Sequence, residues 1–270
     1  MSAPLPAMDP APPVELLSVE KRFANGVLGL EPTTLRVQPG EFVTIIGPSG
    51  CGKSTLLRIA GGLDAPSDGR VWWWRGPFAR VGEEARRLAF VFQDPTLMPW
   101  ASVAANVRLP LDLAGVRRAG ADAQVAAALA EIGLADRATC RPGELSGGMR
   151  MRTSIARALV TDPDLLLMDE PFAALDELSR NRLDERLLQL SAERGLTTLF
   201  VTHSTYEAAF LSTRVIVMAA NPGRIFAEHI IDAPLPRGEA FRLSSAFADH
   251  ARELTRLLTA ASIDSREQDL

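Results

Sequence analysis

Residues 42–63 have the sequence FVTIIGPSGCGKSTLLRIAGGL, in which three different residue patterns follow one another. The apolar run FVTII is typical of a buried β-strand and stops at Gly47. After the glycine-rich stretch GPSGCGKST, apolar residues recur at helical spacing, at Leu56, Leu57, Ile59, Ala60 and Leu63. The segment therefore predicts a strand, a glycine loop and a helix in immediate succession.

The glycine loop matches the pattern G-x-x-x-x-G-K-[ST] of phosphate-binding loops, in the strand-loop-helix context that this motif requires. Glycines let successive backbone N–H groups turn inward around an anion, the following helix adds its positive end, and Lys53 adds a cation. The alternative is a chance glycine turn, which in a chain of this composition has odds of roughly 1 in 1,000. We therefore expect a nucleotide site, in which Ser54 ligates Mg²⁺ and Thr55 hydrogen-bonds a phosphate. The residues expected to bind the nucleotide here are Gly47, Pro48, Ser49, Gly50, Cys51, Gly52, Lys53, Ser54 and Thr55.

A second apolar run, LLLMDE from Leu165 to Glu170, ends in two adjacent carboxylates. Open α/β sheets bind their ligands at the carboxyl ends of the strands. We therefore expect Asp169 to hold Mg²⁺ through water. Glu170 is expected to orient and deprotonate an attacking water, a role worth about 10²- to 10⁴-fold in rate. The alternative, a solvated pair of acids at a strand end, is the weaker interpretation once a phosphate loop is present.

Residues 144–149, ELSGGM, open another predicted helix. They place the hydroxyl of Ser146 and two glycines, Gly147 and Gly148, at a helix N-terminus, which is a favourable place for an anion. A plain helix cap uses the same residues, and from these residues alone it is the better interpretation.

Strands and helices alternate along the chain, which indicates an α/β core with a mainly parallel sheet. Residues 14–46 have the pattern of short β segments with turns between them. The pattern becomes helical from residue 102 to 134, which predicts an inserted helical lobe over about residues 94–160. A last helix is predicted to present one apolar stripe, formed by Phe247, Ala251, Leu254 and Leu258.

The composition is that of a globular protein, because 47% of the 270 residues are apolar and 23% are charged. Two cysteines, Cys51 and Cys140, are too few for a disulfide framework and favour a reducing compartment. No apolar run approaches the length of about 18 to 20 residues that crosses a bilayer. The net charge of −4 argues against a nucleic-acid partner. Residues 1–13 lack the basic cluster and apolar run of a secretory signal, so we expect a disordered tail.

Five motifs occur in the order GPSGCGKST, FQDPTLMPW, LSGGM, LLLMDEPFAALD and VTHS. Together they closely resemble the motifs of the ATP-binding-cassette (ABC) ATPases. The resemblance covers about residues 14–225 and leaves residues 226–270 as a C-terminal extension. It implies an α/β fold in which a phosphate-loop core with a mainly parallel sheet carries an antiparallel β subdomain and the inserted helical lobe.

The resemblance also implies roles for residues that have other interpretations on their own. It implies that Gln93 senses Mg²⁺ and the γ-phosphate, that His203 contacts the γ-phosphate, and that Asp176 links two subunits. Phe23 would stack on adenine, although an aromatic side chain there could equally pack under the sheet. The expected catalytic residues are then Glu170, His203 and Gln93. The expected metal residues are Ser54, Gln93 and Asp169.

The chain contains one phosphate loop and one LSGGM helix. In the family this helix faces the nucleotide held by a partner subunit. The resemblance therefore implies ATP and Mg²⁺ as cofactors and a second ABC ATPase subunit as partner, expected to be an identical copy. The residues that would act across this interface are Ser146, Gly147, Gly148 and Asp176. Met149 stands where the commoner signature, LSGGQ, has glutamine.

Within the family, LMPWASVAANVRLPL, LSGGMR and PGRI look most like the importers of nitrate, sulfonates and taurine, a branch that includes pyrimidine-precursor transporters. This resemblance implies a cytoplasmic ATPase subunit on the inner face of the cell membrane. It would drive separate permease subunits that receive their solute from an extracytoplasmic binding protein. Leu97, Met98 and Trp100 would form the exposed apolar contact with the permease, or alternatively close the lobe's own core.

A soluble ABC ATPase that acts on nucleic acid or ribosomes is the alternative function. The absence of a long heptad insertion between Ser54 and Ser146 and of a basic arm disfavours it. A phosphate-loop kinase is a third possibility, but it leaves the LSGGM helix and the AALD turn without a role.

Overall fold

The computed structural model describes residues 10–78, 86–173 and 175–267. Its strands are β1 (Val14–Arg22), β2 (Leu28–Val37), β3 (Phe42–Ile46), β4 (Asp68–Trp72), β6 (Leu88–Val91), β7 (Leu165–Asp169), β8 (Thr197–Val201), β9 (Arg214–Ala219) and β10 (Arg224–Ile230). Its α-helices are α1 (Lys53–Ala60), α2 (Val103–Leu113), α3 (Arg118–Glu131), α4 (Gly147–Leu159), α5 (Glu177–Arg194), α6 (Thr205–Leu211), α7 (Glu239–Arg242) and α8 (Ser245–Glu267).

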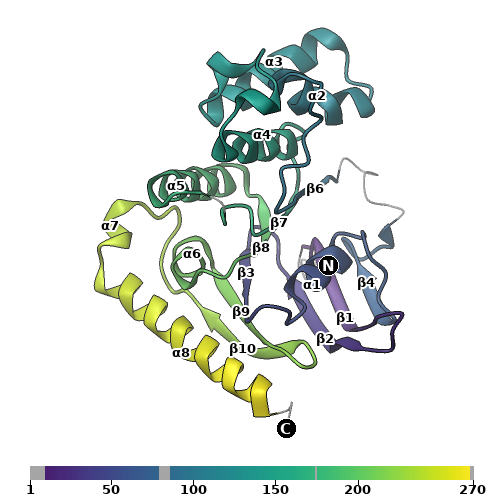
Figure 1. Cartoon of the computed structure of the whole chain (residues 1–270), viewed down its shortest axis with the longest axis vertical. Helices are drawn as coiled ribbons and strands as arrows, with labels where there is room; N and C mark the ends of the chain where they lie inside the picture. Colours follow the sequence, from purple (N-terminus) through teal and green to yellow (C-terminus); the bar gives the residue numbers. More distant parts are fainter. Residues whose placement is uncertain (1–9, 79–85, 174, 268–270) are drawn as a thin grey trace, which may run out of the picture.

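The strands form two sheets (Figure 1). In the larger sheet the order is β10-β9-β3-β8-β7-β6, and every neighbouring pair is parallel except β10 with β9. The smaller sheet, β2-β1-β4, is antiparallel throughout. The predicted fold class, with its mainly parallel sheet and antiparallel subdomain, is confirmed.

Both faces of the larger sheet are covered, which explains why its central strands are continuously apolar. Successive side chains of a strand point to opposite faces. In β7, Leu165 and Leu167 therefore pack with α1 and the smaller sheet, whereas Leu166 and Met168 pack with α4, α5, α6 and α8. Strands β3, β7 and β8 have five residues each, and all of these residues are buried.

Helices α2, α3 and α4 form the predicted helical lobe, which lies at one end of the molecule (Figure 1). The lobe has a hydrophobic core of its own, with Val107 and Leu129 among its buried residues. Helix α4 belongs to both parts: Ala156 packs in the lobe core, and Met151 and Ile155 pack in the main core. The orientation of α4 is therefore fixed from two sides.

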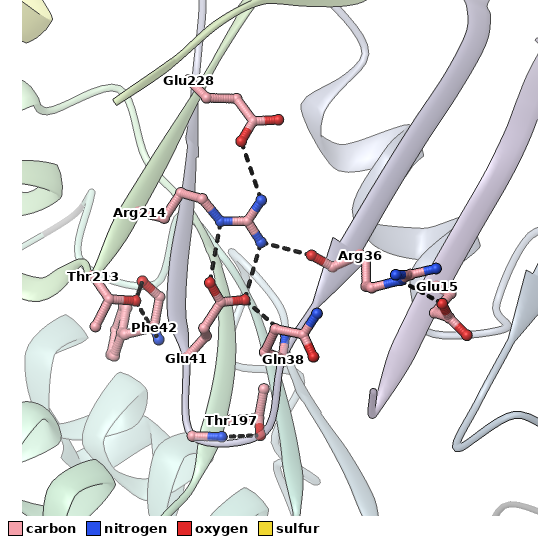
Figure 2. A network of polar contacts seen from close by, with 10 residues as sticks. Glu15, Arg36, Gln38, Glu41, Phe42, Thr197, Thr213, Arg214 and Glu228 are labelled. Atoms are coloured by element: carbon pink, nitrogen blue, oxygen red, sulfur yellow. Dashed lines mark hydrogen bonds and ion pairs between the residues drawn. The ribbon is translucent and has the colours of Figure 1, made fainter. Parts of the chain in front are cut away.

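A polar network closes the end of β3 that is opposite to the phosphate loop (Figure 2). Arg214, the first residue of β9, donates to the two carboxylate oxygens of Glu41 at 3.0 and 3.2 Å and to Glu228 at 3.1 Å. It also donates to the carbonyl oxygen of Arg36 in β2 at 2.6 Å. One guanidinium group therefore joins the two sheets.

The fold includes residues that precede the predicted boundary at residue 14. Pro12 and Pro13 are buried, and the carbonyl oxygen of Pro12 accepts a hydrogen bond from the Trp74 backbone N–H at 3.1 Å. These two residues belong to the fold because they continue directly into β1. The rest of the predicted tail, residues 1–9, lies outside the described residues.

The C-terminal segment is part of the same fold. The predicted boundary at residue 225 falls inside β10, which pairs with β9 along its length. Helix α8 crosses the molecule against α6 and β9 (Figure 1). The predicted stripe contributes Phe247, Ala251 and Leu254 to the core, but Ala261 continues it in place of Leu258. Positions 247, 254 and 261 are seven apart and therefore lie on nearly one line of the helix.

Within the described residues, none of the helices combines the length and the apolar character that crossing a membrane requires.

Candidate nucleotide site

The phosphate loop lies between the end of β3 and the start of α1, as predicted. Gly50 and Gly52 adopt φ angles of +78° and +91°, a left-handed conformation that glycine adopts without steric cost. Gly47 is required for a different reason: a Cβ there would lie 2.6 Å from the Cys51 Sγ and 2.8 Å from the Met218 carbonyl oxygen. The loop conformation therefore depends on glycine at these three positions.

Lys53, the first residue of α1, lies under the loop and is almost completely buried. Its ammonium group donates to the carbonyl oxygens of Gly47 at 3.0 Å and Pro48 at 3.1 Å. These bonds hold a positive charge at the inner wall of the loop, at the N-terminus of α1, where the helix dipole also favours an anion.

A cavity of about 460 Å³ opens over this loop. The predicted residues that line it are Phe23, Ser49, Gly50, Gly52, Lys53, Ser54, Thr55 and Glu170. Phe23 is 43% exposed, which agrees with a place at the cavity and not under the sheet. The other three expected nucleotide residues, Gly47, Pro48 and Cys51, are not among the described residues that line the cavity. The Cys51 thiol is fully buried, and burial raises its pKa.

Ser54 and Asp169 connect the phosphate loop to the end of β7. The Ser54 hydroxyl donates to Asp169 Oδ1 at 2.9 Å, across 115 positions of sequence. Burial raises the pKa of Asp169, the hydrogen bond from Ser54 opposes this rise, and the neighbouring Glu170 carboxylate adds to it. Two of the three predicted metal residues therefore have adjacent oxygen atoms, and Ser54 lines the cavity.

Glu170 follows β7 with a φ angle of +44°, which is uncommon for a residue other than glycine. Its backbone N–H donates to the Val201 carbonyl oxygen at 3.0 Å, and its side chain lines the cavity. His203 lies beside it, with Nδ1 3.5 Å from Glu170 Oε2. The carboxyl ends of β7 and β8 thus bring these two predicted catalytic residues together.

Gln93 is placed differently from the prediction. It is exposed in the segment between β6 and α2, outside the set of described residues that line the cavity. The segment is held toward the helical lobe, because Arg157 of α4 donates to the carbonyl oxygens of Pro95 and Thr96, each at 2.9 Å. Ser54 is among the described residues that line the cavity, whereas Gln93 is not.

The LSGGM segment forms a separate hollow of about 580 Å³, lined by residues of α3, α4 and α5. Ser146 caps α4 by accepting a hydrogen bond from the Met149 N–H at 3.3 Å, and Asp176 caps α5 by accepting one from the Ser179 N–H at 2.9 Å. The helix-cap interpretation of both residues is confirmed, and the two residues also line this hollow. Gly147 and Gly148 line it with them, and a Cβ on Gly148 would lie 3.0 Å from Leu175.

A cluster of buried charges supports the segment that carries His203. Glu207 of α6 accepts a hydrogen bond from the Thr202 hydroxyl and pairs with Arg180 of α5 at 3.2 Å. Asp184, one turn further along α5, pairs with Arg242 of α7 at 3.0 Å. The cluster therefore joins α5, α6 and α7 directly behind His203.

Part of the cavity wall comes from residues that the motifs do not include, namely Val27, Leu28, Gly29, Asn221, Pro222 and Gly223. The turn sequence NPG marks a loop after an apolar strand, but nothing local shows that this loop lies at the phosphate loop. The sequence does not predict the buried charged cluster around Glu207 either, because the spacing of these residues along the chain gives no sign that they are buried.

Comparison with known proteins agrees with this geometry. The model of the ABC transporter family matches residues 30–173. An ATP-binding protein of Brucella abortus biovar 1 (strain 9-941) is 44% identical over 88% of this chain and 90% of its own length. The aliphatic sulfonates import ATP-binding protein SsuB 1 of Xanthomonas axonopodis pv. citri (strain 306) is 45% identical over 80% of this chain and 85% of its own length.

A solved structure has the same fold. It is the dimeric post-hydrolysis state of the ATP-binding cassette MJ0796 bound to ADP and Pi, which is 31% identical with a TM-score of 0.74 and covers 82% of this chain and 100% of that chain. The sheet, the phosphate loop and the cavity define an ATP-hydrolysing enzyme with a phosphate-loop core. The chain belongs to the ABC transporter family, and the predicted ATP binding and ATPase activity are confirmed.

The buried cluster generates a prediction about pH. Burial raises the pKa of Asp184 to about 7, Glu207 adds to the rise, and Arg242 opposes it. A carboxyl with a raised pKa stabilises the fold below its unfolded pKa and loses this contribution as the pH rises through the folded value. The free energy of unfolding of Asp184→Asn, measured in urea, should therefore rise relative to that of the parent protein as the pH is raised from 5 to 8.

The matched control is Glu185→Gln, which removes the neighbouring acid of the same helix at a half-exposed position. Its stability should follow the parent protein across the same pH range. An Asp184→Asn stability difference that is the same at pH 5 and pH 8 would contradict the prediction.

Proposed function

We propose that this chain is the ATP-hydrolysing subunit of an importer for a small solute, of the nitrate, sulfonate, taurine or pyrimidine-precursor type. It would work as a pair of cassettes on the inner face of the cell membrane and drive separate permease subunits. A solute-binding protein outside the membrane would deliver the cargo without touching this chain, and nucleic acid would play no part. The naming of a 45% identical relative as a sulfonate import protein supports the direction and the solute class.

The observation that carries this proposal is the separation of two half-sites within one chain. The cavity over the phosphate loop and the hollow at Ser146 and Asp176 have no lining residue in common among the described residues. The first has the cation and the N–H groups for a triphosphate, and the second has the N-terminus of α4. In a pair of copies related by a twofold axis, the N-terminus of α4 in each copy would close the nucleotide cavity of the other. ATP would then hold the pair together, and hydrolysis would release it.

The residues at the cavity fit Mg²⁺ as the metal. Mg²⁺ is bound by few carboxylates together with hydroxyl, phosphate and water oxygens, and Ser54 and Asp169 supply this kind of donor. Within the described residues there is no cluster of three or more acidic, histidine or cysteine side chains that would indicate another kind of metal site. Bound Mg²⁺ would neutralise charge on the phosphates.

The chain's own residues would carry the remaining steps. Lys53 and the loop N–H groups would hold the phosphates, and Phe23 would stack on the base. Glu170 would accept a proton from the attacking water, and His203, 3.5 Å from it, would orient this carboxylate and contact the terminal phosphate. Gln93 would take part only after the segment between β6 and α2 has moved toward the cavity.

The permease contact is proposed at the loop around Trp100. This side chain is 74% exposed, whereas Leu97 and Met98 are half-buried. The loop is rigid, because the fully buried Asn106 side chain accepts from the Met98 N–H at 2.7 Å and donates to carbonyl oxygens including that of Ser102 at 3.0 Å. An aromatic side chain held exposed on a fixed loop is the usual form of an interface anchor.

The role of Glu170 can be tested with Glu170→Gln. Because Glu170 is proposed to activate water and not to grip ATP, turnover should fall by at least about 10²-fold while ATP binding is kept. Size-exclusion chromatography with ATP should then show a stable dimer. Glu193→Gln, an exposed acid at the end of α5, is the control and should behave as the parent protein. Hydrolysis at the parent rate by Glu170→Gln would remove this residue from the mechanism.

The import function can be tested in membranes. The tagged chain, isolated from detergent-solubilised membranes, should carry an integral membrane permease. In reconstituted vesicles the complex should accumulate an alkanesulfonate or nitrate when ATP and the binding protein are present. Trp100→Asp should abolish copurification and leave the ATPase activity of the isolated cassette unchanged. Leu243→Asp, which alters an 81% exposed apolar residue directly after α7, is the control for copurification.

The alternative function, a soluble ATPase that acts on nucleic acid or ribosomes, predicts that the chain associates with these partners and not with a permease. A chain that cosediments with ribosomes or elutes with nucleic acid, with no permease in the membrane fraction, would contradict the import proposal.

A further inference from the structure

The last turns of α8 contact a loop that forms part of the ATP cavity. Residues 220–223 connect β9 to β10; together with Arg224, the first residue of β10, they are called the wall loop below. Asn221, Pro222 and Gly223 line the cavity together with the phosphate loop. Asp264 and Ser265 of α8 contact Arg224 and Ala220 of the wall loop, two residues that are not among the described residues lining the cavity.

On its cavity side, the wall loop packs closely against the other residues of the cavity wall. The Gly223 N–H donates to the Gly29 carbonyl oxygen at 3.3 Å, and the Gly223 carbonyl oxygen accepts from the Glu31 N–H at 2.8 Å. A Cβ on Gly223 would lie only 2.4 Å from the Cys51 carbonyl oxygen and 2.7 Å from that of Gly29. A displacement of the wall loop would therefore move the phosphate loop or the strand beside Phe23.

The back of the wall loop is held by two contacts from α8. The Ser265 hydroxyl accepts a hydrogen bond from the Ala220 N–H at 2.7 Å and donates to the Ala261 carbonyl oxygen at 2.6 Å. Ser265 and Ala220 are both buried, so no water can replace this bond without rearrangement. Asp264 pairs with Arg224, which also donates to the carbonyl oxygen of Pro222 at 3.1 Å. One arginine thus joins the helix to the residues at the cavity.

The end of α8 is itself firmly placed. Phe247, Leu254 and Ala261 are buried in the main core, and the Thr255 hydroxyl is 3.2 Å from that of Thr205 in α6. Because the helix is anchored along its length, its final turns can fix the position of a loop instead of following it.

We propose that Ser265 and Asp264 are positioning residues of the nucleotide site, which hold the wall loop against the phosphate loop and thereby set the affinity for ATP. Neither residue touches the nucleotide, and both act through the wall loop. The proposal rests on the cavity as the ATP site and does not depend on import or on the solute. It gives the C-terminal segment a function in ATP binding.

The test measures ATP affinity and turnover separately in the purified full-length chain. Ser265→Ala leaves the buried Ala220 N–H without its partner, and the dissociation constant for a fluorescent ATP analogue should rise roughly tenfold. The value of kcat at saturating ATP should stay within about twofold, because Asp169 and Glu170 are positioned by the end of β7 and not by the wall loop. Thermal unfolding is recorded for each variant.

The chain contains a matched control for this substitution. Ser262, one turn earlier on α8, makes the same kind of bond to its own helix, from its hydroxyl to the Leu258 carbonyl oxygen at 2.8 Å. Ser262→Ala removes a helix-internal hydroxyl without touching the wall loop, so ATP affinity should be unchanged.

A dissociation constant for Ser265→Ala that equals that of Ser262→Ala would overturn the proposal and leave α8 a purely structural role. If Ser265→Ala does not fold, Asp264→Asn decides the question at a more exposed position. It should weaken ATP binding by roughly threefold with kcat kept, because Arg224 loses its charged partner. Unchanged affinity in Asp264→Asn would then overturn the proposal. None of these results bears on copurification with a permease, so this inference and the import function fail independently.

Discussion

Because β9, β3, β8, β7 and β6 run parallel, their carboxyl ends meet at one edge of the sheet, and the site is assembled there. The phosphate loop follows β3, Asp169 and Glu170 stand at the end of β7, and His203 follows β8. The hydrogen bond between Ser54 and Asp169 joins two of these ends across 115 positions of sequence. The left-handed glycines, the buried lysine and the unusual φ angle of Glu170 all have their effect only because the strands deliver them to this edge.

The parts of the site that could be predicted from the sequence are those whose chemistry is contained in a short segment. The order of glycines around Lys53 determines a loop and a helix N-terminus with little help from the rest of the chain. The apolar run before Asp169 determines both a buried strand and the edge at which it ends. The alternation of such runs with helical segments also determined the fold class, since it leaves few ways to cover both faces of a parallel sheet.

The remaining parts depend on contacts that local pattern does not contain. The wall loop reaches the cavity because β9 pairs with β3, and its NPG turn would look the same on any surface. Gln93 belongs to a recognisable motif, yet its position depends on Arg157, which holds the turn that follows Gln93 toward the lobe from more than 60 positions away. The burial of Asp184 and Glu207 likewise follows from the packing of α5, α6 and α7, because charged side chains carry no local sign of being buried.

One arginine connects the turn that carries Asp176 with the segment that carries His203. Arg180 donates to the Leu175 carbonyl oxygen at 2.9 Å, next to Asp176, and pairs with Glu207, which holds Thr202 next to His203. A movement of the Asp176 turn would therefore be transmitted to His203 through Arg180 and its buried partner Glu207. The α8 helix contacts the same region at Thr205 and the cavity at the wall loop, so both ends of the nucleotide site are tied to one C-terminal element. The C-terminal segment thus packs into the same core as the strands that carry the site, which explains why the predicted boundary at residue 225 falls inside β10.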